Sequence, residues 1–146
     1  MDIKIERLQS NLMIIRTCAG WSTSELGERL GVSRQMISNL ENGRNVMTQM
    51  QYLAIRYVLS EELRKSQLNG DTQMLKDVIR VLVDEPEMFN DEQRRQVISD
   101  ANLLAPSIVA KKTTRKKASS LWTMALAGAF VATVAVGVSS LLNGKE

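Results

Sequence analysis

Four polar side chains in the segment 33–43 have the types and spacing to contact the base edges of DNA: Arg34, Gln35, Ser38 and Asn39. On a helix they occupy the side opposite Met36, Ile37 and Leu40, which form an apolar face. Arginine, glutamine and asparagine are the side chains that form paired hydrogen bonds with guanine or adenine in the major groove. The segment therefore predicts a base-reading helix face.

The residues around this face predict two short helices joined by a tight turn. Ser22 is suited to cap the first helix, and Glu25 can complete a capping box with it. Gly31 is suited to end that helix in the left-handed region, Ser33 caps the second helix, and Gly43 stops it. Because only about three residues join the two helices, we expect them to cross steeply.

This stretch, from about Leu8 to Leu59, resembles the Cro/CI-type helix-turn-helix of the XRE family. The residues that carry the resemblance are Arg16, Trp21, Glu25-Leu26, Leu30-Gly31-Val32-Ser33, Ile37-Ser38 and Leu40-Glu41-Asn42-Gly43. The resemblance implies an all-α, five-helix, lambda-repressor-like domain over residues 1–66 that binds double-stranded DNA. It also implies that Arg16 pairs with Glu41 as a structural ion pair.

A second set of residues is expected to hold DNA phosphates: Thr23, Ser24, Ser33 and Arg44. Many proteins that resemble this stretch place a Thr-Gln pair where this chain has Thr23-Ser24. A serine hydroxyl reaches less far than a glutamine amide, so the phosphate contact expected at Ser24 is a shorter one.

Composition argues against several classes of chemistry. The chain has no histidine and one cysteine, Cys18, so it cannot form an intrachain disulfide or a Cys/His zinc site. We interpret Cys18 as a small buried apolar residue. Because no nucleophile and base constellation is apparent either, we expect no enzyme activity, cofactor, metal or small-molecule substrate.

The basic character of the chain comes from one short segment. The net charge is +3, yet residues 1–110 hold 13 basic and 15 acidic side chains. The excess lies in Lys111, Lys112, Arg115, Lys116 and Lys117. A positive DNA-facing patch must therefore arise from the arrangement of a few side chains such as Arg34 and Arg44.

Apolar periodicity places further helices along the chain. The first runs from about Lys4 to Cys18, and another begins after Thr48 as its N-cap. The core face expected for the latter is Met50, Leu53, Ala54, Tyr57 and Val58. We expect a short fifth helix from Ser60 rather than a continuation of this helix.

Residues 71–105 predict an amphipathic helical hairpin. One helix follows Asp71 with an apolar stripe of Met74, Leu75, Val78, Ile79 and Leu82, and Pro86 interrupts it. The second opens at Asp91, directs Val97, Ile98, Ala101 and Leu104 inward, and ends before Pro106. Such a hairpin has too little core to stand alone, so it packs on the first domain or forms a dimer with another copy.

The C-terminal part predicts a membrane anchor. Residues 121–142 carry no charge, and 22 residues at about 1.5 Å each reach about 33 Å, enough to cross a hydrocarbon core of about 30 Å. The basic linker 106–120 precedes this span, and its cluster Lys111, Lys112, Arg115, Lys116 and Lys117 is suited to the lipid surface on the cytoplasmic side. No secretory signal is apparent at Met1 to Glu6, so we expect the N-terminal domain in the cytoplasm of a bacterial cell.

Two functions fit these features. The first is a membrane-anchored, sequence-specific DNA-binding transcriptional regulator that acts as a homodimer. The alternative is a membrane-associated scaffold whose helix-turn-helix domain binds a protein, since some bacterial cell-shape proteins with this layout hold a cytoskeletal filament. Those proteins normally carry an extracytoplasmic domain that is not apparent here, and this chain retains Gln35 and Asn39, so the first function is favoured.

Overall fold

The computed structural model describes residues 2–66 and 73–111, and the ordered elements of both ranges are helical. The helices are α1 (Ile3–Ser10), α2 (Leu12–Cys18), α3 (Thr23–Leu30), α4 (Arg34–Glu41), α5 (Gln49–Ser66), α6 (Gln73–Ile79) and α7 (Asp91–Lys111). A π-helical turn, Arg80–Asp84, and a 3-10 turn, Pro86–Met88, connect α6 to α7. The expected all-α class is confirmed for the part of the chain that the structure describes.

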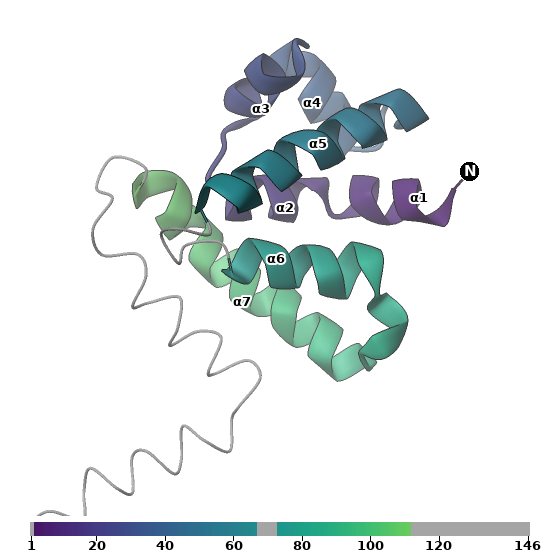
Figure 1. Cartoon of the computed structure of the whole chain (residues 1–146), viewed down its shortest axis with the longest axis vertical. Coiled ribbons are helices and arrows are strands. Elements are labelled where there is room, and N and C mark those ends of the chain that lie inside the picture. Colours follow the sequence, from purple (N-terminus) through teal and green to yellow (C-terminus); the bar gives the residue numbers. More distant parts are fainter. Residues whose placement is uncertain (1, 67–72, 112–146) are drawn as a thin grey trace, which may run out of the picture.

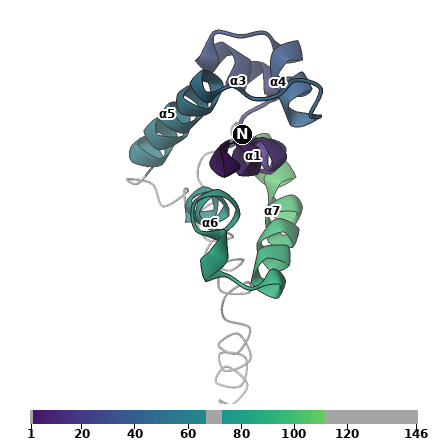
Figure 2. The same cartoon turned by 90° about the vertical axis from the view of Figure 1, so that its right-hand side faces the viewer.

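The helices form three layers, which Figures 1 and 2 show from two directions. The rod made by α1 and α2 lies in the middle. On one side of it α3, α4 and α5 form the helix-turn-helix layer, and on the other side α6 and α7 form a hairpin. The hairpin therefore packs on helices of its own chain, and it lies on the side of the rod away from α4.

A continuous hydrophobic core joins the three layers. Leu8, Leu12 and Ile15 on the central rod are completely buried, because apolar side chains cover them from both sides. Trp21 and Leu26 extend this core toward α3, and α6 closes it from below with its apolar stripe. The stripe expected at Met74, Leu75, Val78, Ile79 and Leu82 is buried throughout.

The first helix is divided, which the sequence did not predict. We expected one helix from Lys4 to Cys18, but it breaks at Asn11, whose backbone angles are φ −112° and ψ 11°. The side-chain amide of Asn11 donates a hydrogen bond to the carbonyl of Arg7 at 2.8 Å. An asparagine side chain that bonds the backbone nearby competes with the regular helical pattern, which gives a local reason for the break.

The expectations for α5 were wrong in two respects. The helix continues without interruption to Ser66, so no separate fifth helix begins at Ser60. Its buried positions are Ile55 and Leu59, whereas Met50, Leu53 and Tyr57 of the expected core face are exposed. Apolar residues occur on more than one side of α5, so periodicity alone could not identify the side that packs on the rod.

The second helix of the hairpin, α7, begins at Asp91 as expected but ends later than expected. The N-cap of α7 is Asn90, whose side chain accepts a hydrogen bond from the N–H of Gln93 at 2.8 Å. We expected α7 to end before Pro106, but it runs through this proline to Lys111. A proline removes one backbone hydrogen bond of a helix. Here Pro106 is exposed, while Ala105 and Ile108 on either side of it pack inward.

The proposed membrane span, residues 121–142, lies outside the described residues, as do most of the linker 106–120 and the basic residues Lys112, Arg115, Lys116 and Lys117. Within the two described ranges, no helix has both the length and the apolar character needed to cross a bilayer.

Candidate nucleic-acid interface

The start of α3 is fixed by the capping box that the sequence predicts. The Ser22 hydroxyl accepts a hydrogen bond from the N–H of Glu25 at 3.1 Å, and the Glu25 carboxylate accepts one from the N–H of Ser22 at 3.1 Å. These bonds satisfy two backbone donors at the helix start. The helix geometry leaves the N–H groups of Thr23 and Ser24 without an intrahelical acceptor, so they can donate to an anion.

Two glycines set the turn between α3 and α4. Gly31 adopts φ +69° as the C-cap of α3, which is the left-handed position expected for it. Gly27 is needed for another reason, because a Cβ atom there would lie 2.7 Å from the carbonyl oxygen of Val32. The N–H of Val32 donates to the carbonyl of Gly27 at 2.9 Å. The close approach of the turn to α3 therefore fixes where α4 begins.

Helix α4 has one buried face and one polar face, as predicted. Ser33 caps it by accepting a hydrogen bond from the N–H of Met36 at 3.1 Å. Ile37 and Leu40 are buried in the core. On the other side Arg34 and Gln35 are exposed, and Ser38 and Asn39 are partly exposed. All four expected base-reading residues are thus brought together on the accessible side of one helix.

Two of these side chains are linked to each other. The Gln35 amide nitrogen Nε2 donates to Oδ1 of Asn39, one turn later, at 3.0 Å. This bond holds both amides along the exposed side of α4 and reduces the conformational freedom that they would lose on binding. Gln35 retains its oxygen as an acceptor and one N–H as a donor, which is the combination that the adenine edge requires.

The expected structural pair ties α4 to α2. Arg16 donates from Nε to Oε1 of Glu41 at 2.5 Å and from Nη2 to Oε2 at 3.3 Å. A third donor of Arg16, Nη1, bonds the carbonyl of Trp21 at 2.8 Å. Only 9% of Arg16 is exposed. Because Arg16 forms hydrogen bonds with both the end of α4 and the segment before α3, it fixes these two helices relative to the central rod.

Gln9 on α1 also positions α4, and sequence reasoning missed it. Its Nε2 donates to the carbonyls of Leu40 at 3.0 Å and Asn45 at 2.6 Å, and its Oε1 accepts from the N–H of Met47 at 2.9 Å. One side chain thus holds the end of α4 and the loop that leads to α5. No local pattern marks this role, because the partners lie 31 to 38 residues away along the chain.

The expected phosphate contacts lie on accessible parts of the same layer. Ser24, Ser33 and Arg44 are exposed, and Thr23 is partly buried at the first turn of α3. The Ser33 oxygen is an acceptor in its cap, so its O–H remains a donor for a phosphate. The N–H of Arg44 bonds the carbonyl of Asn39 at 2.9 Å, which fixes the backbone of this loop beside the end of α4.

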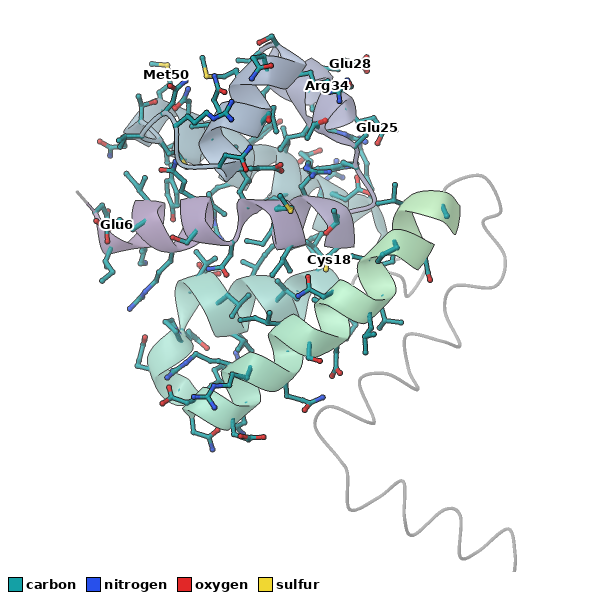
Figure 3. All side chains as sticks on the ribbon, turned by 180° about the vertical axis from the view of Figure 1, so that it is seen from behind. Glu6, Cys18, Glu25, Glu28, Arg34 and Met50 are labelled. Carbon is teal, nitrogen blue, oxygen red and sulfur yellow. The ribbon has the colours of Figure 1, made fainter. Side chains whose placement is uncertain are left out.

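The remaining chemistry-bearing residues lie away from this layer. Figure 3 shows Arg34 pointing outward from α4, whereas Cys18 lies between the rod and α7. Cys18 is buried, and burial raises the pKa of its thiol to about 12, so it stays protonated at neutral pH. Among residues 2–66 and 73–111, no group of acidic or cysteine side chains is arranged to hold a metal ion.

Comparison with known proteins supports the helix-turn-helix assignment. Residues 12–50, about a quarter of the chain, match the family model for the helix-turn-helix. The match runs from α2 through α3 and α4 to the start of α5, so it includes both helices of the unit and the Arg16–Glu41 pair. This confirms the helix-turn-helix part of the Cro/CI-type resemblance, and it indicates a DNA-binding regulator. No curated protein and no solved structure matches the chain.

Proposed function

We propose that this chain is a sequence-specific DNA-binding transcriptional regulator that is anchored in the cytoplasmic membrane and acts as a homodimer. Its N-terminal domain lies in the cytoplasm, and α4 binds in the major groove of double-stranded DNA. The observation that carries the DNA-binding part is the exposed polar side of α4 on a helix that the fold holds at both ends. Ser33 fixes its start, and Arg16 and Gln9 fix its end.

The proposal assigns different tasks to the polar residues of this layer. Arg34 is suited to guanine, because its guanidinium can donate two hydrogen bonds to O6 and N7. Gln35 is suited to adenine, with Asn39 orienting its amide, and Ser38 contributes a hydroxyl donor or acceptor beside them. Thr23, Ser24, Ser33 and Arg44 bind the phosphates on either side and set the register of α4 in the groove.

The anchor is proposed from the sequence. Residues 121–142 form an uncharged stretch of sufficient length, and Lys111, Lys112, Arg115, Lys116 and Lys117 precede it on the side that contains the DNA-binding domain. In this arrangement the basic cluster binds anionic lipid headgroups. The described part of α7 reaches Lys111, the first residue of the basic cluster.

The DNA-binding proposal can be tested by selecting duplexes from a random pool with the full chain in mild detergent. A common sequence should be enriched, and Arg34→Ala with Gln35→Ala should abolish the enrichment while leaving weak binding to random DNA. Arg95→Ala with Gln96→Ala is a matched control. These two residues also lie side by side on an exposed helix, and Gln96 bonds Asp100 four residues later, at 2.9 Å, as Gln35 bonds Asn39.

The α7 double variant should keep the wild-type enrichment, because α7 lies on the side of the rod away from α4. Equal loss in the two double variants would reject the contacts assigned to α4. If the wild-type chain enriched no sequence, the DNA-binding proposal would fail. The alternative, a scaffold that binds a protein such as a cytoskeletal filament through its helix-turn-helix layer, would then become the better explanation.

The anchor has a separate test. Cells that express the full chain are separated into soluble and membrane fractions, and the membranes are washed with high salt and with alkaline carbonate. A chain that spans the bilayer stays in the pellet after both washes. Release by salt would mean that only the basic cluster holds the protein at the surface, because salt screens exposed charges. Recovery of the full chain in the soluble fraction would reject the proposed anchor.

A further inference from the structure

A partly open cleft of about 340 Å³ lies beside the rod, where α5 of the helix-turn-helix layer and α6 of the hairpin come together (Figure 2). Its volume falls in the range of cavities that hold small molecules in proteins. Leu59, Leu63 and Ile79 contribute apolar walls, and the lining also includes charged side chains from both layers. None of the lining residues belongs to α3 or α4. The cleft is therefore separate from the proposed DNA-binding side.

The walls of the cleft are aliphatic because α5 and α6 each direct one side toward it. Leu59 and Leu63 are one turn apart on α5, and Ile79 lines the cleft from α6. The exposed fractions of Leu59 and Ile79 are 2% and 5%, so most of their surface belongs to the core. At about 30 Å³ for a water-sized group, the volume corresponds to roughly eleven such groups. The cleft therefore fits an apolar body of about eight carbons with a small polar group.

Basic side chains outnumber acidic ones in the lining of the cleft. The basic residues are Arg56, Lys76 and Arg80, and the acidic residues are Asp84 and Glu85. Arg80 pairs with Glu85 at 2.8 Å, and Arg56 pairs with Asp84 at 3.1 Å. Among the lining residues one positive charge thus remains in excess, and Lys76, which is exposed, supplies it. A ligand with a single negative charge is complementary to this lining.

Arg56 has donors that its partner does not use. Its Nη2 donates to Oδ2 of Asp84 at 3.2 Å, which is the one hydrogen bond of its side chain within the described part of the chain. Nη1 lies 3.1 Å from Oδ1 of the same carboxylate, yet it is buried and has no hydrogen-bond partner there. Because buried donors are nearly always hydrogen-bonded in proteins, this position favours an acceptor on a ligand. A second carboxylate could bond Arg56 and leave its pair with Asp84 in place.

We propose that the cleft between α5 and α6 binds an aliphatic monocarboxylate of about eight carbons. The carboxylate accepts hydrogen bonds from Arg56 and lies near Lys76, and the hydrocarbon chain lies along the apolar walls. Arg56 belongs to α5, and its partner Asp84 belongs to the π-helical turn of the hairpin. The bound carboxylate therefore adds to the link between the two layers. This inference does not depend on the proposed DNA-binding function.

The test follows methyl NMR signals of the full chain in lipid nanodiscs during a titration with octanoate, whose size matches the cleft. The signals of Leu59, Leu63 and Ile79 should shift and saturate, with a dissociation constant on the order of 1 mM. The signal of Leu103, an exposed leucine of α7 outside the cleft, should not move. Octanol lacks the charge and butyrate lacks most of the chain, so both should bind at least about tenfold more weakly.

These controls separate a site from uptake into lipid. Equal binding of octanol and octanoate would reject the carboxylate site. Shifts that do not saturate, or that include Leu103 equally, would show partition into the bilayer and would overturn the proposal. So would the absence of any shift in the cleft.

Charge variants test the assigned contacts. Arg56→Gln should weaken octanoate binding by about tenfold or more, because it removes the charged donor that holds the carboxylate. Lys76→Gln should weaken it by about two- to fivefold, as expected for an exposed charge. Lys65→Gln is the matched control, because Lys65 is an exposed lysine of α5 that does not line the cleft. Equal losses in the two lysine variants would reject a contact with Lys76.

Asp84→Asn separates the donor of Arg56 from the ion pair itself. Arg56→Gln and Asp84→Asn both break the pair, but Asp84→Asn leaves the guanidinium free for the ligand. It should therefore bind octanoate at least as tightly as wild type. Thermal unfolding of each variant without ligand checks that the fold is kept. Wild-type affinity in Arg56→Gln, or an equal loss in Asp84→Asn and Arg56→Gln, would overturn the proposed site.

Discussion

Arg16 and Glu41 are joined by two hydrogen bonds between a guanidinium on α2 and a carboxylate at the end of α4. Their side chains are only 10% and 3% exposed. The pair lies where the central rod meets α4, and the third donor of Arg16 bonds the segment that leads to α3. One arginine therefore positions both helices of the helix-turn-helix unit.

Removing one member of this pair should be strongly destabilising. In Glu41→Ala the guanidinium of Arg16 remains buried without its counter-charge, which typically lowers the free energy of unfolding by about 3–5 kcal/mol. Arg16→Met combined with Glu41→Leu should lose less than Glu41→Ala alone, because no unpaired charge remains buried. Urea unfolding monitored by circular dichroism measures the difference. A double variant as unstable as Glu41→Ala would show that the unpaired buried charge is not the cause of the lost stability.

Gly27 and Gly31 should respond differently to alanine. At Gly27 the new Cβ atom would meet the Val32 carbonyl at 2.7 Å, and forcing the turn apart typically costs about 1–3 kcal/mol. At Gly31 nothing lies within 4 Å of the new atom, but φ is +69°, and alanine in the left-handed region costs about 1–2 kcal/mol. Gly31→Asn should recover part of that loss, since asparagine tolerates this region better.

Thermal unfolding of the three variants checks this pair of explanations. Helix propensity alone would make Gly27→Ala stabilising by about 1 kcal/mol. Whether the variant is more or less stable than wild type therefore distinguishes the effect of the close contact from that of helix propensity. A stabilised Gly27→Ala would reject the contact with Val32. A Gly31→Asn variant no more stable than Gly31→Ala would reject the backbone explanation for Gly31.

Cys18 should make stability depend on alkaline pH. Its thiol has a pKa of about 12 in the folded chain, against 9.0 without burial. Above about pH 9 the unfolded chain releases this proton while the folded chain keeps it, so the free energy of unfolding falls as pH rises. The slope from this group is at most about 1.4 kcal/mol per pH unit, and the loss is complete near pH 12. Below pH 9 this contribution is fully present and constant.

The measurement is urea unfolding of wild type and Cys18→Ala between pH 8 and pH 11. The other titrating groups are common to both proteins. The difference between the two proteins in how the free energy of unfolding changes with pH therefore gives the contribution of the thiol. Wild type should lose stability more steeply than Cys18→Ala above pH 9. Parallel curves, or rapid alkylation of the folded wild-type thiol at pH 8, would contradict the burial of Cys18.

Gln35 and Asn39 should contribute unequally to base preference. Gln35→Ala should weaken binding to a selected site by about 1–3 kcal/mol at one adenine position and leave binding to random DNA unchanged. Asn39→Ala should have a smaller effect at the same position, because it removes the hydrogen bond that orients Gln35 rather than the base contact. Competition assays with single base substitutions measure both. If the two variants lost preference at different positions, Asn39 would read a base of its own.

Local features of the fold could be predicted from the sequence because their causes act within a few residues. The Ser22–Glu25 capping box, the Ser33 cap and the left-handed Gly31 each involve partners at most four positions apart, and the structure has all three. The polar side of α4 was predictable for the same reason, since helical spacing alone separates it from Ile37 and Leu40. The apolar stripe of α6 follows the same rule and is buried as expected.

Other features depend on contacts between distant parts of the chain, and only the tertiary structure decided them. Periodicity showed that α5 has apolar residues, but packing against the rod buried Ile55 and Leu59 and left Met50, Leu53 and Tyr57 exposed. Gln9 acquires its three partners only when α1 lies against the end of α4. Pro106 lies within α7, where its neighbours Ala105 and Ile108 pack inward. The sequence by itself thus determined which side of α4 is polar and accessible, through local hydrogen bonds and helical spacing. Tertiary packing determined how that side is held and which apolar residues of α5 stay exposed.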